Sequence, residues 1–421
     1  MRRATTTALL LLLALAGSAQ PARAAAGALD TSFSSDGIVT AFKTGSVANA
    51  IAVDHAGRTV VVGQTTDEHV DVAVARFRAD GTPDPSFGGD GRVRMSLGAD
   101  AVVAFDVAVA PDDGLAIVGR RTVGATEDSF VLRLNEGGEP VGAFGADGLT
   151  LVNFGKQESA NAVAFTDAGR IDIGGYASNG TAQRCALARL NADGSLDPRL
   201  SGDGMRFLDV SAGAEQVNDL LALPRGDIVA AGPADTEGRP AFMILRVHAS
   251  GNLVPGFGTD GVTRTDLGPG ADVANAMAVT RSGSFAVVGG AGNDGHLDWG
   301  VVRYLDDGSL DPVFGDGGIK ILSWTSFPEA ADDVLSTGRR LVVAGRIHHT
   351  GTGDDAGVVR LRAGGKLDGT FGSGGVTRVD VSGGPETAHG VALQANGKVL
   401  LAGETWTAGS PRFLVARLRA G

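Results

Sequence analysis

The sequence predicts an all-β protein, a β-propeller with seven blades, four antiparallel strands per blade and about 57 residues per repeat. Two observations support this prediction: one unit recurs along the chain, and the residue pattern of each copy predicts short strands separated by turns. Glycine supplies 65 of 421 residues, about twice its usual share, as a turn-rich chain requires. The apolar fraction of 43% excludes a disordered chain, and the glycines lack the three-residue period of collagen.

Three markers recur seven times each, which establishes the repeat. The apolar anchors are Phe33, Phe87, Phe144, Leu200, Phe257, Phe314 and Phe371. The arginines are Arg76, Arg133, Arg189, Arg246, Arg303, Arg360 and Arg417. The glycines that close an apolar run are Gly63, Gly119, Gly175, Gly232, Gly289, Gly345 and Gly403. Neighbours in each series are 54 to 58 residues apart, so the three series indicate seven copies of one unit.

The last copy illustrates the four strands of a repeat. Residues 375–381 alternate between apolar and polar side chains, which predicts the first strand. Residues 390–394 and residues 398–402 are two further strand-like runs separated by an Asn-Gly turn, which predicts a hairpin. Residues 413–418 form the fourth strand after a variable loop. The third and fourth strands are apolar on both faces, so each blade requires a neighbour on either side.

We expect a single propeller domain over residues 28–421. The first and last copies are full and regular, which favours a closed ring over an open solenoid with atypical capping repeats. The chain begins with the loop motif and ends on a fourth strand. We therefore expect Leu29–Phe33 to meet residues 418–421 at a seam.

Residues 1–24 are expected to be a cleaved signal peptide, so the protein would be secreted, periplasmic or at the cell surface. Arg2 and Arg3 precede the apolar run Ala8–Ala16, and Ala22–Ala24 fits a small-x-small cleavage site. This run is too short to span a bilayer, and no later run is longer, so no transmembrane segment is expected. Cleavage removes three arginines, which changes the net charge from −12 to −15. Such a charge disfavours nucleic acid as a partner, and we expect a monomer.

A motif of the form Leu-Asp-x-x-Phe-Gly-x-x-Gly-x-Val precedes each hairpin, and Val-Ala-Arg-Leu follows it; the best copies of the motif are Leu310–Ile319 and Leu367–Val376. This pattern resembles the delta-60 repeat, a family found in tandem in secreted bacterial proteins. The resemblance covers residues 28–421 and implies a β-propeller of unknown function, with no catalytic residues to carry over. Val141 and Val254 replace the motif aspartate, and Leu200 replaces the motif phenylalanine.

The seven repeated arginines are interpreted as structural. Catalysis needs a residue once, whereas a joint between blades needs it in every blade. We expect each arginine to donate hydrogen bonds to carbonyls or a carboxylate of a neighbouring loop. The candidate acids are Asp30, Asp84, Asp197, Asp311 and Asp368, or Asp36, Asp90, Asp147, Asp203 and Asp260.

The sequence indicates no catalytic, cofactor or metal-binding residues. Calcium is an alternative suggested by Asp-Gly clusters such as Asp80–Gly91, but these lack the alternate oxygen ligands and the later glutamate of a calcium loop. His348 and His349 lie beside two aspartates, yet adjacent histidines on a strand point in opposite directions. Cys185 is interpreted as a buried small apolar residue.

Charged residues also collect after the apolar anchor, in the first strand of several repeats. If this strand borders the central channel, its side chains are candidates for ligand binding. The candidates are Arg94, Asp209, Arg264, Asp266, Arg378 and Asp380. A hydrated, salt-bridged lining is the alternative interpretation.

We therefore interpret the protein as a non-catalytic binding or protein-interaction module with a protein or glycan partner. The alternative is an extracellular hydrolase or lyase with its site at the channel mouth. Such a site would be assembled from several blades and would leave no local motif. A third hypothesis assigns partner contacts to the variable loops Gln64–Asp71, Arg121–Ser129 and Gly345–Ala356.

Overall fold

The computed structural model describes residues 25–42, 45–66, 69–155, 157–180, 182–236, 238–293, 295–351, 353–381 and 383–420. The predicted signal peptide, residues 1–24, lies outside these ranges. Within them the chain forms 28 β-strands and one short 3-10 helix, η1 (Pro224–Gly226), so the predicted all-β class is confirmed. No described helix is long and apolar enough to cross a membrane.

The strands follow one another in chain order. The first fourteen are β1 Ile38–Ala41, β2 Ser46–Val53, β3 Thr59–Thr65, β4 Asp71–Phe77, β5 Arg92–Met95, β6 Ala101–Val109, β7 Leu115–Val123, β8 Thr126–Leu134, β9 Leu149–Val152, β10 Gln157–Phe165, β11 Ile171–Ser178, β12 Gln183–Leu190, β13 Met205–Leu208 and β14 Asp219–Ala222. The others are β15 Ile228–Thr236, β16 Arg239–Val247, β17 Val262–Thr265, β18 Val273–Val279, β19 Phe285–Asn293, β20 His296–Tyr304, β21 Ile319–Leu322, β22 Ala330–Thr337, β23 Arg340–His349, β24 Gly353–Arg362, β25 Val376–Val379, β26 Glu386–Leu393, β27 Val399–Thr407 and β28 Ser410–Leu418.

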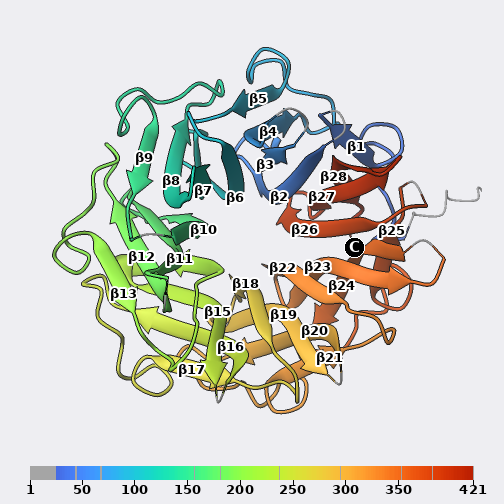
Figure 1. The fold of residues 1–421 in the computed structure, drawn as a ribbon. Coiled ribbons are helices and arrows are strands. Elements are labelled where there is room, and N and C mark those ends of the chain that lie inside the picture. The colour runs from blue at the N-terminus through green and yellow to red at the C-terminus, as the bar shows by residue number, and fades with distance from the viewer. Residues whose placement is uncertain are drawn as a thin grey trace, which may run out of the picture.

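The strands form antiparallel four-stranded sheets arranged around a common centre (Figure 1). Five sheets have four strands, in the orders β2-β3-β4-β5, β14-β15-β16-β17, β18-β19-β20-β21, β22-β23-β24-β25 and β26-β27-β28-β1. An eight-stranded sheet consists of two such halves, β6–β9 and β10–β13, joined by one parallel bridge between Gln157 and Glu127. The fold is a β-propeller.

The sheets are offset from the sequence repeat by one strand. The strand that follows each motif pairs with the arginine-bearing strand before it and completes the preceding sheet. β1, the first described strand, pairs instead with β28, the last described strand. Leu29 also bridges Leu418, and the Gly27 amide N donates to the Arg419 carbonyl oxygen at 3.0 Å. The expected meeting of the two ends of the chain is confirmed.

The repeated glycines are explained by a close approach of two backbones. The first strand of most sheets bulges opposite the glycine, for example between Ala48 and Ala50 opposite Gly63. A Cβ atom at Gly63 would lie 2.0 Å from the carbonyl oxygen of Val47, well inside van der Waals contact. Because any side chain would displace this carbonyl, the position is restricted to glycine.

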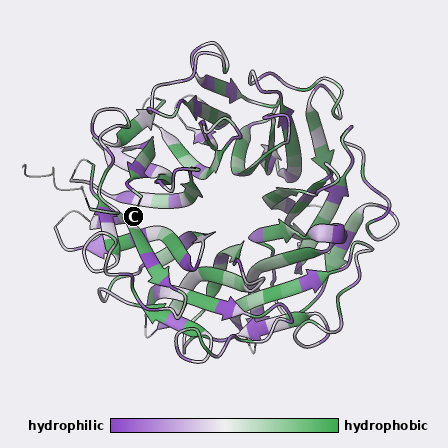
Figure 2. Ribbon diagram, turned by 180° about the vertical axis from the view of Figure 1, so that it is seen from behind, coloured by the Kyte–Doolittle hydropathy of each residue, from purple (hydrophilic) through white to green (hydrophobic). Residues whose placement is uncertain are grey.

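The core lies between successive sheets. One apolar cluster joins Val60 and Val74 of the β2–β5 sheet to Ile117 and Leu132 of the next sheet. A second joins Val61 to Phe413, so the sheet that holds both chain ends packs against the β2–β5 sheet. Hydrophobic residues concentrate in the strands and hydrophilic ones in the connections (Figure 2). The repeated apolar anchors are buried among these clusters.

Candidate functional site

The repeated arginines lie on the third strand of each sheet, and most of them are tied to a buried acid. Arg76 is 2% exposed; its Nε donates to Asp84 Oδ2 at 2.8 Å, and its Nη1 donates to the Glu136 carbonyl oxygen of the next repeat. Its guanidinium also lies 4.7 Å from the centre of the Phe87 ring. The same arrangement recurs for Arg303, Arg360 and Arg417, which pair with Asp311, Asp368 and Asp30.

Repeats that depart from the motif use a different acid. Where Val254 replaces the motif aspartate, Arg246 Nη2 donates to Asp227 Oδ2 at 2.8 Å. Where Val141 replaces it, Arg133 lies 3.8 Å from Asp112. Arg189 instead donates to Asp172 at 2.6 Å. These acids come from the hairpin of the first two strands. Asp227 and Asp112 therefore pair with the arginine where the motif aspartate is missing, whereas Arg189 pairs with Asp172 although the motif residue Asp197 is present.

The six charged candidates from the sequence lie at the perimeter of the molecule. Arg94, Arg264 and Arg378 are on β5, β17 and β25, which are edge strands far from the centre (Figure 1). Asp209, Asp266 and Asp380 follow β13, β17 and β25. The expectation that this strand borders the centre is wrong, because it completes the preceding sheet at its outer edge.

These perimeter residues do not form one site. Arg94 Nε donates to Asp71 Oδ2 at 2.7 Å, and Asp266 pairs with Arg239 at 3.0 Å. The structure brings only Asp209 and Arg264 together, around a shallow pocket beside Ser211. Because all six candidates are exposed and are distributed over the outer strands of four sheets, the structure places no ligand site among them at the channel mouth.

The strands nearest the centre carry acids and no lysine or arginine. They are β2, β6, β10, β14, β18, β22 and β26. Asp106 and Asp333 follow a bulge in β6 and β22, and Asp219 begins β14. Asp106 Oδ2 accepts a hydrogen bond from the Val163 amide N on β10 at 2.8 Å. Asp219 accepts one from Met277 at 2.6 Å, and Asp333 accepts one from Val391 at 2.7 Å. Each aspartate therefore connects its strand to the first strand of the next sheet.

The surroundings of the three aspartates raise their pKa values above the ordinary value of an aspartate. Burial is the largest influence and raises the pKa of Asp106 to about 6, and backbone hydrogen bonds offset this only in part. Burial likewise raises the pKa of Asp333 to about 7. The pKa of Asp219 lies well above its ordinary value, because burial and the charge of Asp106 both oppose ionisation.

Sequence reasoning missed these aspartates, although a signal was present. They are 113 and 114 residues apart, which is twice the repeat length, so a search for residues present in every copy passes over them. At the same position the first, third and fifth repeats carry Ala50, Ala162 and Ala276, and the seventh carries Gly390.

One titratable pair interrupts the series of asparagines at the neighbouring bulge position. Asn49, Asn161, Asn218 and Asn275 each donate a side-chain hydrogen bond to a carbonyl of the next sheet. In the sixth and seventh repeats the equivalent residues are Asp332 and His389, and Asp332 Oδ2 lies 3.4 Å from His389 Nδ1. Burial lowers the pKa of His389, but the hydrogen bond and charge of Asp332 outweigh it, and the pKa is raised.

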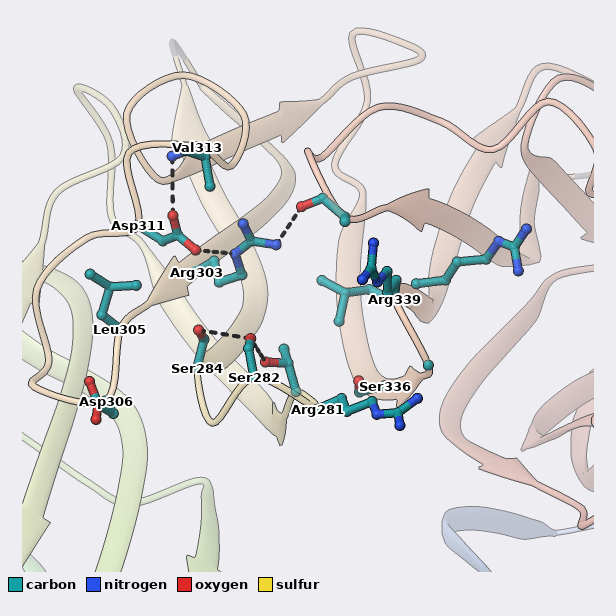
Figure 3. A pocket seen from close by; sticks show the side chains of 15 residues that line it. Arg281, Ser282, Ser284, Arg303, Leu305, Asp306, Asp311, Val313, Ser336 and Arg339 are labelled. Carbon is teal, nitrogen blue, oxygen red and sulfur yellow. Dashed lines mark hydrogen bonds and ion pairs between the residues drawn. The ribbon is translucent and has the colours of Figure 1, made fainter.

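A large pocket lies between two neighbouring sheets (Figure 3). The turns β18–β19 and β22–β23 form two of its walls, and the loop between β20 and β21 forms a third; it encloses about 890 Å³. Its lining includes the four arginines Arg281, Arg303, Arg339 and Arg340. Two aspartates, Asp306 and Asp311, also line it, so cations outnumber carboxylates.

Hydroxyl groups line this pocket together with the arginines. Thr280 Oγ1 lies 2.9 Å from Ser282 Oγ, which in turn lies 3.3 Å from Ser284 Oγ (Figure 3). Arg303 is held in place by Asp311 at 2.7 Å and by the Ala363 carbonyl oxygen. The pocket therefore offers charged donors and hydroxyls that can both donate and accept.

The remaining residues singled out from the sequence have local roles. His348 Nδ1 lies 2.9 Å from Asp354 Oδ1, and the Phe327 ring lies 4.0 Å from the His348 ring. Cys185 is buried, and burial raises the pKa of its thiol. Among the described residues no group of three His, Cys, Asp or Glu side chains is arranged to hold a metal ion.

A family model confirms the resemblance that the repeat indicated. The model of a domain of unknown function (DUF5122) β-propeller matches residues 57–87, 169–199, 287–314, 339–371 and 394–421. Each matched segment starts near a hairpin turn. Four of them end at or beside the apolar anchor of a motif, the fifth ends at residue 421, and the five matches are spread along the chain. The search of curated proteins found no match.

Several solved structures match most of this chain at low sequence identity. A catalytically inactive variant of virginiamycin B lyase from Staphylococcus aureus, with quinupristin, is 11% identical, with a TM-score of 0.49 over 90% of this chain and 98% of that one. The polysaccharide lyase Uly1 is 10% identical, with a TM-score of 0.49 over 88% and 89%. A putative glucose dehydrogenase from Thermus thermophilus is 14% identical, with a TM-score of 0.39 over 91% and 99%.

Proposed function

We propose that this chain, which carries the repeat of a β-propeller family of unknown function, is an exported seven-bladed propeller that binds a ligand or partner and does not catalyse a reaction. The count of seven is supported by the three repeated markers and by treating the two halves of the eight-stranded sheet as separate blades. Closure of the ring is supported by the pairing of β1 with β28. Export is supported by the pattern of residues 1–24.

The observation that carries this proposal is the contrast between repeated joints and unequal turns. The arginines on the third strands and the glycines opposite the first strands recur in every repeat, as assembly requires. The turns between the first two strands of the sheets differ in charge, however: the β6–β7 turn holds Asp112 and Asp113, whereas the β22–β23 turn holds Arg339. A uniform scaffold that presents unequal turns on one face is suited to recognition.

An extracellular hydrolase or lyase is the second candidate function, and the Asp332–His389 pair favours it. A histidine beside a carboxylate is a common acid-base arrangement, and the pair lies on the first strands of two neighbouring sheets, β22 and β26. The binding function is favoured over it because the large pocket lies elsewhere, between the β18–β21 and β22–β25 sheets.

A thermal-shift panel of neutral glycans, small anions, divalent metals and candidate protein partners tests the binding function. A ligand that binds the native state raises the melting temperature by an amount that grows with its concentration relative to its dissociation constant. We expect at least one class to stabilise the purified protein. The absence of any stabilising class, together with turnover of a glycan that His389→Ala abolishes, would favour the enzyme instead.

The loop hypothesis is tested by exchanging exposed segments between repeats. Replacing the variable loops within Gln64–Asp71, Arg121–Ser129 and Gly345–Ala356 with one another should abolish capture of a protein partner while leaving the melting temperature within a few degrees. Unchanged capture after all three exchanges would assign the contacts to another face.

A further inference from the structure

We propose that the pocket between the β18–β19 and β22–β23 turns binds a sugar-sized organic anion, one whose carboxylate or phosphate is held by Arg281 and Arg339. The inference rests on the proposed binding function and names its ligand class. It depends on which of the four pocket arginines are already neutralised.

Two pocket arginines have partners within the protein. Arg303 pairs with Asp311 at 2.7 Å, and Arg340 pairs with Asp368 at 2.7 Å. Arg303 also donates to the Ala363 carbonyl oxygen of the next sheet, and Asp368 is shared with Arg360 and Arg362. Both guanidinium groups therefore already contact a carboxylate before any ligand arrives.

The other two arginines have no such partner. Neither Arg281 nor Arg339 forms a hydrogen bond or an ion pair with any residue in the described ranges, and both are exposed. A guanidinium group presents several donors in a plane that matches the two oxygens of a carboxylate or phosphate. Two such groups line one pocket of a chain whose net charge is −12. The pocket is therefore a local concentration of positive charge on an acidic protein, and it attracts an oxyanion.

The hydroxyl groups and the size of the pocket define the chemical class of the ligand further. Thr280, Ser282 and Ser284 form a hydrogen-bonded row beside Arg281, and Ser336 of β22 also lines the pocket. Hydroxyls of this kind exchange hydrogen bonds readily with ligand hydroxyls. A volume of about 890 Å³ exceeds the needs of an inorganic ion and lies in the range of small-molecule sites. A polyhydroxylated ring that carries an oxyanion meets all three features.

The test is isothermal titration calorimetry at low ionic strength with four probes: glucuronate, glucose 6-phosphate, inorganic phosphate and neutral glucose. We expect at least one of the two sugar anions to bind and glucose not to bind. The carboxylate and phosphate probes show which oxyanion is preferred. Each of Arg281→Gln and Arg339→Gln should weaken binding about tenfold, the effect of losing one charge-assisted hydrogen bond.

Arg225→Gln is the matched control. Arg225 is an exposed arginine in the equivalent turn of the fourth repeat, and it does not line this pocket. This variant should bind like the wild type, and all three variants should keep the wild-type melting temperature.

Three results would overturn the inference: equal binding of glucose and the sugar anions, wild-type binding by the Arg281→Gln/Arg339→Gln double variant, or no binding of either sugar anion. If a neutral glycan or a protein partner still stabilises the protein in the thermal-shift panel, the anion inference fails alone. If nothing in either experiment binds, the proposed binding function fails with it. Tight binding of inorganic phosphate alone would also contradict a sugar-sized ligand.

Discussion

At the scale of single residues, repetition identifies the side chains that hold neighbouring sheets together. Arg76 contacts an acid, a phenylalanine ring and a carbonyl of the next repeat while almost fully buried. Hydrogen bonds from Thr370 and the charge of Arg360 outweigh burial and lower the pKa of Asp368, the acid of an equivalent tie, to about 2. These ion pairs therefore require both the arginine and the aspartate to be charged.

Removal of one of these arginine–aspartate ion pairs should destabilise the fold strongly. We expect Arg76→Leu to lower the free energy of unfolding by about 3 kcal/mol, because it removes the nearest cationic partner of the buried carboxylate of Asp84. Urea denaturation at neutral pH measures this. Arg225→Leu, at an exposed and unpaired arginine, should change it by less than about 0.5 kcal/mol. Equal stability of the two variants would mean that the repeated arginine is not structural.

The repeated glycine supports a second prediction at this scale. In Gly345→Ala the new methyl group would lie 2.1 Å from the Ala330 carbonyl oxygen, so the strand must shift. We expect a loss of about 2 kcal/mol, measured by urea denaturation. Gly369→Ala places its methyl group in open space and should be neutral within error. A neutral Gly345→Ala would show that the bulge can relax at no cost.

At the scale of elements, the inner strands are joined in two ways. Asparagine amides donate to carbonyls of the next sheet from Asn49, Asn161, Asn218 and Asn275. Carboxyl groups accept from amides of the next sheet at Asp106, Asp219 and Asp333. The carboxyl joints depend on pH, whereas the amide joints do not.

The raised pKa values predict that stability falls as the pH rises from about 4 to above 7. Because the folded pKa of Asp106 is about 6 and that of Asp333 about 7, the native state binds more protons than the unfolded state in this window. Each pKa unit corresponds to about 1.4 kcal/mol before screening by solvent. The carboxyls are partly accessible, so we expect a smaller net loss of about 1 kcal/mol for each.

Thermal unfolding from pH 4.5 to 8 checks this prediction. The variant Asp106→Ala/Asp219→Ala/Asp333→Ala, which copies the alanines of the other repeats, should have a flatter pH profile and a lower stability at pH 5. An unchanged slope in this variant would assign the pH dependence to other acids. Glu158, whose pKa is raised to about 6 mainly by burial, is the first to test in that case.

At the scale of the whole molecule, the sheet that contains both chain ends decides whether the propeller is closed. Only β1 completes this sheet, through its pairing with β28, and the bridge of Leu29 with Leu418 extends the seam. We expect a chain that starts after Ala41 to lose at least about 10 °C in melting temperature, because β28 becomes an uncovered edge. Differential scanning calorimetry against a chain that starts at Ala25 measures the difference. Equal melting temperatures would show that the seam contributes nothing to closure.

The repeat count and the strand-turn pattern could be predicted from the sequence because periodic residues report on every copy at once. The inner and outer strands could not be assigned, since Arg94 and Val107 both occupy short alternating runs that look alike without the pairing. The arginine pocket was also beyond sequence reasoning. Arg281 and Arg339 are 58 residues apart, and only the packing of neighbouring sheets brings their turns to one pocket.

The pairing of β1 with β28 also determines how the protein would respond to mechanical force. Gly27 lies beside Arg419, and the strands then run together from Ile38 and Ala416 to Ala41 and Phe413. Both chain ends therefore leave the sheet at the same end of this antiparallel pair. Tension applied through them would open the hydrogen bonds one after another, as in a zipper, and not load them all together. Single-molecule pulling should accordingly release β1 at low force, before any other strand.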